Sequence, residues 1–371
     1  MGWRELLSLF RCYWHYRKNG LDPGYDGIFE DRFCKAFAEM QGGGYADAVS
    51  SGTASLYVAL KSLKLPAGSL IATSPVTDAS VIGVICEQGH RPYLIDSAPD
   101  SYNVTLEQLQ DRFRPDIKAM ILTHAAGEPS DPIRIASFCV QHGVELIEDC
   151  SQAVGATPKA SQIKVGNFGR LGCFSTMYRK NLSVSGSSGI VFTRDESTHR
   201  IAKQHADRGK KWWNKELVDM RDPGFADFPG LNWNSDEFRC AIGLANLSRL
   251  ERTNSRRRAF LNLLVSSMRE NPNHVLSPYN YHEGFSPFYF PILVDPTRIK
   301  ISVDDFARAL QAEGIGIGVR YGCLVSTWNW AKPVMFDGFE SVNAVSTRDR
   351  CFHLYVNENY GKKELDDVLK A

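Results

Sequence analysis

The sequence predicts an α/β fold, with a large domain built on a mostly parallel sheet flanked by helices and a smaller α+β domain at the C-terminal end. Three observations support this fold class. Helix-like and strand-like patterns alternate from residue 45 onward, as in strand–helix–strand units. The expected strands are short, apolar and β-branched, which is typical of a sheet covered on both faces. The pattern changes after Ala241, and 371 residues are enough for about two domains.

We therefore expect three parts: an N-terminal helical segment over residues 1–28, a large domain over residues 29–250 and a small domain over residues 251–371. Residues 6–18 of the first part are aromatic and basic. Such a segment either lies on a membrane surface or packs as a terminal helix on its own domain or on a partner subunit. We favour the packed helix.

Helices and strands are expected to alternate along the large domain. Apolar residues recur with a helical period in 54–65, 79–90, 105–113 and 132–143, and buried strands are expected at 69–74, 91–96, 117–123 and 144–149. Gly143 is the expected C-cap of its helix. Ligands of parallel sheets bind at the carboxyl ends of the strands, so residues that follow the strands are candidates for a site.

The C-terminal part begins with residues 241–271, which predict one long helix with an arginine cluster at 256–258. This helix would link the two domains. Residues 287–295 and 303–320 predict strand, helix and strand, and residues 362–371 predict a closing helix.

The composition excludes several classes of protein. With 43% hydrophobic and 23% charged residues and a formal net charge of +1, the chain is typical of a soluble globular protein and not of a nucleic-acid binder with a basic surface. The nine cysteines include no C-x-x-C pair and no histidine at zinc spacing, so we expect reduced thiols in a cytoplasmic protein and no metal. No apolar run reaches the length of about 20 residues that a membrane helix needs, and we expect no membrane partner.

Ser51, Gly52 and Thr53 stand at the start of the helix expected after residue 50. Free N–H groups and the positive end of the helix dipole favour an anion there, and a phosphate group could approach closely over a glycine. The alternative is an ordinary serine or threonine N-cap, which suits any helix.

Asp149 ends an expected buried strand, and Gln152 follows it. A buried carboxylate needs a cationic partner, and this one lies where a ligand of the sheet would lie. A structural salt bridge or the N-cap of the next turn is the alternative.

Lys180 lies between an apolar run and a Gly/Ser turn, five residues after Ser175. A lysine removed from water has a lowered pKa and becomes a nucleophile for carbonyl groups. The alternative is a surface lysine. Together with the anion site and Asp149, however, Lys180 completes what pyridoxal 5'-phosphate needs: an anchor for its phosphate, an acid for its pyridine nitrogen and an amine for its aldehyde.

The chain resembles the DegT/DnrJ/EryC1/StrS sugar aminotransferases, which have the type I fold of pyridoxal-phosphate enzymes. The resemblance rests on four motifs in the family's order, "SGTASL", "EDCSQAVGA", "FSTMYRKNL" and "GLNWNSDE", and covers about residue 29 to the C-terminus.

The resemblance implies that Lys180 is the catalytic residue and holds the cofactor as a Schiff base, with Asp149 at the pyridine nitrogen and Gln152 at the ring hydroxyl. It implies that Gly52, Thr53 and Ser175 hold the phosphate, which Asn232 of a second subunit also reaches, so that the enzyme is a homodimer with shared sites. His124 matches a family turn, and we interpret it as structural.

The chain departs from the family pattern at three positions. Asp78 replaces the aromatic residue that stacks on the cofactor, Asn234 replaces an arginine, and Val154 replaces a histidine. These departures affect substrate recognition more than the cofactor assignment.

Four further residues are candidates for substrate binding. Trp212 and Trp213 lie in a basic, aromatic loop that could bind a nucleotide diphosphate. The alternative is that this loop is a dimer interface. Arg320 and Tyr321 come from the second domain. We expect an aminotransferase that moves an amino group from glutamate or glutamine to a keto sugar. A nicotinamide-dependent dehydrogenase is not expected, since no G-x-G-x-x-G follows the first strand. Nucleotide linkage of the sugar is expected. A sugar dehydratase of the same family and a catalytically degenerate ligand-binding relative are the alternatives, and Lys180 argues against the dehydratase because dehydratases replace this lysine.

Overall fold

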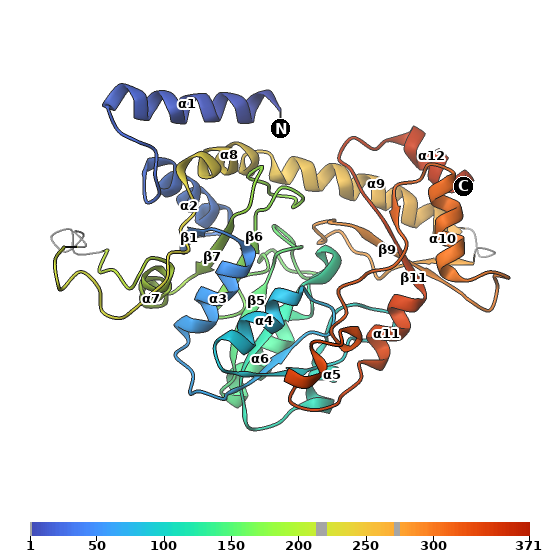
Figure 1. The fold of residues 1–371 in the computed structure, drawn as a ribbon. Helices are drawn as coiled ribbons and strands as arrows, with labels where there is room; N and C mark the ends of the chain where they lie inside the picture. The colour runs from blue at the N-terminus through green and yellow to red at the C-terminus, as the bar shows by residue number, and fades with distance from the viewer. Residues whose placement is uncertain (1, 213–220, 271–274) are drawn as a thin grey trace.

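The polypeptide forms two sheets with helices packed around them (Figure 1). The structure is a computed structural model that describes residues 2–212, 221–270 and 275–371. The larger sheet has seven strands in the spatial order β1 (Tyr45–Val49), β7 (Gly189–Thr193), β6 (Leu171–Ser175), β5 (Glu145–Asp149), β4 (Ile117–Thr123), β2 (Leu70–Thr73) and β3 (Arg91–Leu94).

Six of these strands point the same way, which confirms the mostly parallel sheet. Only β7 is antiparallel to its neighbours β6 and β1. The chain reaches β7 from β6 through the loop that contains Lys180, without a crossover helix, and a direct return of this kind joins antiparallel strands. The carboxyl ends of β1, β5 and β6 therefore meet the beginning of β7 at one edge of the sheet.

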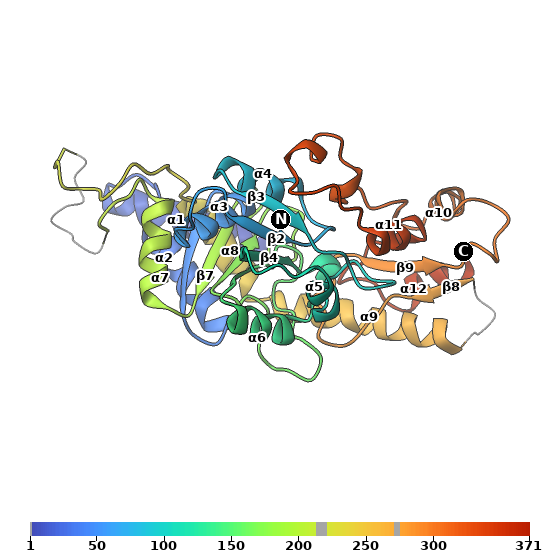
Figure 2. The ribbon, with the colours of Figure 1, turned by 90° about the horizontal axis from the view of Figure 1, so that it is seen from below.

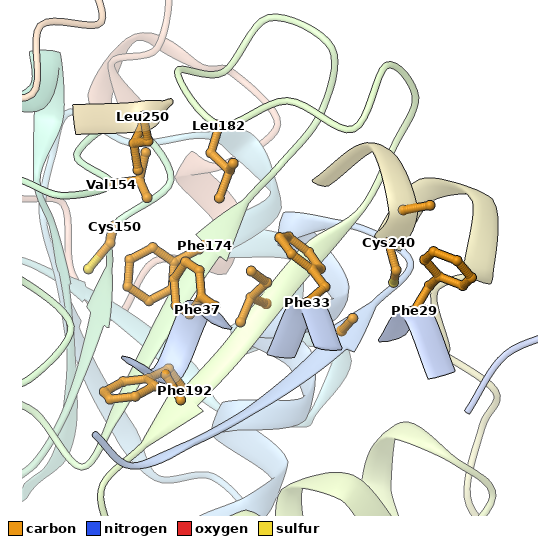
Figure 3. Packing of buried hydrophobic residues seen from close by; sticks show 14 of the residues in the cluster. Phe29, Phe33, Phe37, Cys150, Val154, Phe174, Leu182, Phe192, Cys240 and Leu250 are labelled. Carbon is orange, nitrogen blue, oxygen red and sulfur yellow. The ribbon is translucent and has the colours of Figure 1, made fainter. Parts of the chain in front are cut away.

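Helices cover both faces of the large sheet. On one face lie α2 (Ile28–Met40), α8 (Glu237–Leu247), α5 (Leu106–Arg112) and α6 (Pro132–His142); on the other lie α3 (Gly52–Ser62), α4 (Ala79–Glu87) and α7 (Glu196–Ala206). Figure 3 shows aromatic rings of α2 packed against those of the sheet, where the Phe37 ring lies 4.9 Å from Phe174 and 6.3 Å from Phe192. Gly143 has φ 64° and caps α6, as predicted.

The smaller sheet is antiparallel, in the order β10 (Ile317–Gly318), β11 (Cys351–Leu354), β9 (Phe290–Val294) and β8 (Leu276–Pro278). Its core includes residues of α9 (Leu250–Glu270), α10 (Val303–Ala312) and α12 (Lys362–Lys370), and α11 (Val342–Asp349) lies beside β11. Figure 2 shows this region at one end of the molecule, beyond the large sheet. The predicted boundary at residues 250 and 251 falls at the start of α9 and stays a prediction.

The prediction of one long helix over residues 241–271 is wrong, because the chain forms two helices, α8 and α9, that are separated at Ser248 and Arg249. Polar side chains next to this interruption are bonded to residues from other parts of the chain. Asn246 donates to the backbone oxygen of Ser183 (2.6 Å), and Arg249 pairs with Glu5 and donates to Asn246 (2.6 Å). These bonds hold the turn between α8 and α9.

The N-terminal helix α1 (Trp3–Asn19) packs on α8, the first of the two packed arrangements expected from the sequence. Tyr16 donates to the buried carboxylate of Glu237 (2.5 Å), which also accepts the backbone N–H groups of Phe29 and Glu30 at the start of α2. Within the described ranges, every helix is too short or too polar to cross a bilayer.

Candidate active site

The carboxyl edge of the large sheet brings together residues that lie more than 100 positions apart in the chain. In the register of the sheet, Asp149 of β5 lies beside Cys173 of β6, and Ser175 lies opposite Gly189, which in turn pairs with Val49 at the end of β1. The start of α3, the end of β5 and the loop after β6 therefore border one region, as the parallel topology requires.

The first component is the N-terminus of α3, where few side-chain atoms lie over the backbone N–H groups. Ser51 is the N-cap of α3 and accepts the backbone N–H of Ala54 (3.0 Å), so the N-cap alternative is correct for Ser51. Gly52 faces Ser175: a Cβ added to Gly52 would lie 2.7 Å from the Ser175 Cβ. Thr53 is exposed. The N–H groups of Gly52 and Thr53 lie in the first turn, where α-helices have no internal acceptor for them, and the Ser175 hydroxyl is beside them.

The second component is the buried carboxylate of Asp149, which is 3% exposed. It accepts the backbone N–H of Ser151 (3.1 Å). Burial raises the pKa of Asp149, against the opposing influence of Ser151 and Lys180. Among the described residues no cation lies within 4.0 Å of this carboxylate, so the structural salt bridge is not formed. A buried acid in this state fits a cationic ring nitrogen brought by a ligand.

The third component is Lys180, which is half-buried in the β6–β7 loop. Its Nζ lies 4.5 Å from the centre of the Phe288 ring. Burial lowers the pKa of Lys180, while the charges of Asp149 and Asp78 act to raise it. Lys180 is therefore not the surface lysine of the alternative, and its amine loses its proton more readily than that of a free lysine.

The neighbouring Asn181 holds the lysine loop in position. Its amide donates to Ser286 Oγ (3.0 Å) and to the backbone oxygen of Pro287 (3.1 Å), and its carbonyl oxygen accepts from Arg257 (2.6 Å). The loop is thus fixed to the segment that carries Phe288. The sequence contains this segment as the aromatic run "PFYFP", but nothing in that run indicated a contact with Lys180.

Gln152 joins the loop after β5 of the large sheet to the loop after β10 of the smaller one. Its Oε1 accepts the backbone N–H of Ala126 (2.9 Å), and its Nε2 donates to the Tyr321 hydroxyl (2.8 Å). The Tyr321 ring lies among Tyr102, Tyr289 and His353. Two predicted residues, one assigned to the cofactor and one to the substrate, are therefore in direct contact.

Asp78 lies close enough to the site for its charge to act on Lys180 and Asp149. It is exposed, and it is the N-cap of α4, where it accepts the N–H of Ser80 (2.9 Å). The segment before it pairs with the loop that carries Cys323, through Thr77 N–H and the Cys323 backbone oxygen (3.2 Å). The site thus has a carboxylate where the family pattern has a stacking ring.

The loop that carries Asn232 is attached to the end of β1, because Ser50 N–H donates to the Trp233 oxygen (2.6 Å). Asn232 itself is exposed, and its Oδ1 accepts from the backbone and the side chain of Asn234. None of the hydrogen bonds among the described residues joins Asn232 to Gly52 or Ser175.

The contacts recorded for Trp212 and Arg320 are with residues outside these components. Trp212 packs by α7, with Lys203 Nζ 5.1 Å from its ring, and Trp213 lies outside the described residues. Arg320 pairs with Asp304 of α10 (2.9 Å).

His124 has the structural role expected from the sequence. Its Nδ1 accepts the backbone N–H of Ser130 (2.9 Å), which leaves Nε2 to donate to Glu148 (3.1 Å). Glu148 also accepts the N–H groups of Gly166, Phe168 and Gly169. These two residues and Cys150 form a buried cluster of metal-binding types, but hydrogen bonds within the protein occupy both nitrogens of the histidine and both oxygens of the glutamate.

The residues at this edge of the sheet therefore fit pyridoxal 5'-phosphate. A helix start with a glycine and a serine hydroxyl suits the phosphate, a buried acid without a cation suits the pyridinium nitrogen, and a desolvated amine suits the aldehyde. When bound, this cofactor supplies an aldehyde for the exchange of amino groups and an electron sink.

Comparisons with known proteins identify the family of the chain. The family model described as "DegT/DnrJ/EryC1/StrS aminotransferase family" matches residues 23–371. The aminotransferase from Psychrobacter cryohalolentis has 23% identity and a TM-score of 0.88, over 100% of this chain and 95% of that one. Helicobacter pylori PseC, an aminotransferase involved in the biosynthesis of pseudoaminic acid, has 18% identity and a TM-score of 0.86, over 100% and 96%.

A GDP-4-keto-6-deoxymannose-3-dehydratase is also similar, with 19% identity and a TM-score of 0.86 over 98% of this chain and 96% of that one. At these identities the structures show the shared fold, and the family model shows the membership. The chain therefore belongs to the DegT/DnrJ/EryC1/StrS aminotransferase family and is, as its motifs predicted, a pyridoxal-phosphate-dependent aminotransferase of fold type I.

Proposed function

We propose that this enzyme transfers an amino group from glutamate or glutamine to a keto sugar that is linked to a nucleotide, in amino-sugar biosynthesis. The observation that carries the proposal is the meeting of Lys180, the buried Asp149 and the Gly52–Ser175 contact at one edge of the sheet. Similar proteins support the sugar: one of them is described as binding GDP-perosamine and another as acting in pseudoaminic acid biosynthesis.

Lys180 is proposed to bind the cofactor aldehyde and then to carry the proton between the donor carbon and the cofactor. Both tasks begin with the neutral amine, which reacts with the aldehyde in the first task and takes up a proton, to return it later, in the second. Burial beside Phe288 favours the neutral form. The same ring keeps water from one side of the amine.

Asp149 is proposed to hold the proton of the pyridinium nitrogen, and Gly52, Thr53 and Ser175 to bind the phosphate through N–H and hydroxyl groups. Gln152 is proposed to lie at the ring hydroxyl. Since its Oε1 and one Nε2 hydrogen are bonded to Ala126 and Tyr321, its second Nε2 hydrogen remains for that contact. Asp78 is assigned to the cofactor face of the site, without stacking.

A homodimer is proposed because the Asn232 side chain is exposed, next to the end of β1. In that position Asn232 is available to a partner subunit. Trp212, Trp213, Arg320 and Tyr321 remain proposed substrate contacts. We also propose a cytoplasmic location, since six of the nine cysteines are buried and all are unpaired, as in reducing compartments.

A dehydratase is the second candidate, because a dehydratase is among the similar structures. Lys180 favours the aminotransferase, since it provides the amine that returns the cofactor to its starting form after each transfer.

Purified protein with pyridoxal phosphate tests both candidates. Borohydride reduction followed by peptide mapping is expected to find the cofactor on Lys180, and Lys180→Ala is expected to lose it. The matched control is Arg179→Ala, at the exposed neighbour. Glutamate or glutamine is expected to convert the cofactor to its amine form, and a nucleotide-linked keto sugar to reverse the change. Release of a deoxy sugar that carries no amino group would favour the dehydratase, and failure to bind the cofactor would contradict both.

A further inference from the structure

The outer surface of α1 is apolar, although this helix lies on the outside of the molecule (Figure 1). Trp3, Phe10 and Trp14 are 80%, 60% and 57% exposed, and the exposed Leu7 lies between them. Positions 3, 7, 10 and 14 fall on one face of a helix. The rings of Phe10 and Trp14 stack at 6.2 Å. We define these four residues as the α1 face.

The α1 face cannot turn inward, because the opposite side of the helix is fixed. Tyr16 is bonded to Glu237, Ser8 Oγ donates to the Ala241 oxygen (2.6 Å), and Glu5 pairs with Arg249. These contacts bury the inner side of α1 on α8 and on the turn before α9. The apolar residues are therefore held outward by the fold.

Positive charge borders the α1 face. Arg4, Arg11 and Lys18 repeat every seven residues and form a stripe along one side of it, and Arg17 lies on the other side. The single acid of the helix, Glu5, is buried on the inner side and paired. An apolar face with cationic borders is typical of helices that lie in the headgroup region of a membrane.

A cavity of about 330 Å³ adjoins the start of α1 and is rich in arginine. Its lining includes Arg4, Arg249, Arg252 and Arg256, with Glu358 at the side. Glu358 is engaged by Arg257 (2.8 Å), and Glu5 by Arg249. Arg4, Arg252 and Arg256 have no carboxylate within 4.0 Å among the described residues. The cavity therefore holds a surplus of positive charge, as a phosphate group requires.

We propose that the α1 face and this arginine cavity together dock the enzyme on an anionic phospholipid surface. The α1 face would enter the headgroup region, and the cavity would bind a lipid phosphate. Arg4 borders the α1 face and also lines the cavity. The site does not involve the active-site residues, so the inference does not rest on the proposed function, and it revises the expectation from sequence that no membrane takes part.

Charge favours this occupant over a second copy of the chain. A two-fold contact of the α1 face with itself would bring the cations of both helices together without an exposed acid from either helix, and like charges in contact are unfavourable. Anionic lipids instead attract each lysine and arginine near the membrane surface.

Vesicle sedimentation tests the proposal with the full chain loaded with cofactor. We expect binding to vesicles of equal parts phosphatidylcholine and phosphatidylglycerol, little binding to phosphatidylcholine alone, and weakening by salt. Arg252→Gln with Arg256→Gln is expected to lower the affinity by roughly tenfold or more. Lys362→Gln with Lys363→Gln on α12 is the control, because it removes the same charge from two other exposed residues. Trp3→Ala with Trp14→Ala is expected to lower binding to a similar degree, with transamination unchanged.

Several outcomes would overturn the proposal. These are equal binding to neutral vesicles, no binding to either, or the same loss in the α12 control. Binding of inorganic phosphate in the cavity without vesicle binding would show an anion site alone. Dissociation of a dimer by the Trp3 and Trp14 substitutions, measured by sedimentation velocity without lipid, would show that a second copy covers the α1 face.

Discussion

Gly52, at the first position of α3, faces Ser175 at the end of β6, and a Cβ on Gly52 would lie 2.7 Å from the Ser175 Cβ. Real Cβ atoms essentially never approach so closely. The two residues are 123 positions apart in sequence, and only the pairing of β6, β7 and β1 brings them together. The absence of a side chain at Gly52 therefore opens the space between the helix N-terminus and the serine hydroxyl.

Gly52→Ala is expected to close this space. The φ angle of Gly52 is not in the left-handed region, so the effect comes from contact and not from backbone strain. We expect the affinity for pyridoxal phosphate to fall by roughly tenfold or more, the loss of one to two charge-assisted hydrogen bonds, as measured by titration of absorbance. Gly83→Ala in α4 is the control, since nothing lies within 4 Å of its added Cβ. Equal affinities for the two variants would contradict the phosphate assignment.

Asp149→Asn is expected to reduce transamination by roughly 100-fold or more, since the pyridinium nitrogen loses its ionic partner. The cofactor-free protein should not lose stability near neutral pH, because burial raises the pKa of Asp149 and the ionised carboxylate is costly there. Thermal unfolding and the rate of the amine half-reaction measure the two effects. Glu148→Gln is the contrast: it accepts three backbone N–H groups, and its replacement is expected to destabilise the fold by about 1–3 kcal/mol.

Removal of nearby negative charge is expected to lower the pKa of Lys180 further. Burial already lowers it, and Asp149 and then Asp78 oppose that change. In cofactor-free protein, the pH midpoint for modification of Lys180 by an amine-specific reagent should fall in Asp78→Asn, and fall more in Asp149→Asn. Peptide mass spectrometry measures it, with the exposed Lys118 as an internal reference. A midpoint that rises in Asp78→Asn would mean that its carboxylate does not face the amine.

Periodicity and end signals predicted much of the fold. The expected strand at 117–123 has the bounds of β4, and Gly143 ends α6 as expected. Both signals are local. The order of strands is not local, so the antiparallel β7 and its pairing with β1 were not predicted. The break between α8 and α9 was missed for the same reason, since it depends on Ser183 and Glu5 from distant segments.

Residues of the candidate site could be proposed from the sequence where a residue type and its place in the pattern both indicated chemistry. Lys180, Asp149 and Gly52 satisfied that condition. Phe288 did not, because an apolar aromatic run is typical of any core, and its position over Lys180 depends on Asn181 and Arg257. The contact between Gln152 and Tyr321 could not be predicted either, since it joins loops of the two domains that are far apart in the sequence.

The hydrogen bond between Gln152 and Tyr321 is expected to couple the large sheet to the smaller one. Tyr321→Phe should cost about 1 kcal/mol of unfolding free energy, and Gln152→Met should cost more, since it also frees the N–H of Ala126. The double variant should be less destabilised than the sum of the two, by about 0.5–1.5 kcal/mol. Urea unfolding of the four proteins measures the coupling. Additive changes would show that the bond contributes nothing to the joint between the sheets.

Glu30 is expected to make stability depend on pH. Burial, and next the charge of Asp47, raise the pKa of Glu30 from 4.5 to about 8, despite a bond from the Asp26 N–H (2.6 Å). A carboxyl whose pKa is higher in the folded state stabilises the protein below the unfolded pKa, and this stabilisation is lost as the pH rises from about 4.5 to 8. The slope of the unfolding free energy is at most roughly 1.4 kcal/mol per pH unit for one proton.

Glu30→Gln cannot ionise at this position, so its unfolding free energy should vary less with pH and exceed that of the original chain at pH near 8. Glu39→Gln, at an exposed position of the same helix, is the control and should keep the original slope. If urea unfolding gives the same slope for Glu30→Gln as for Glu39→Gln, the buried carboxyl is not the group that titrates.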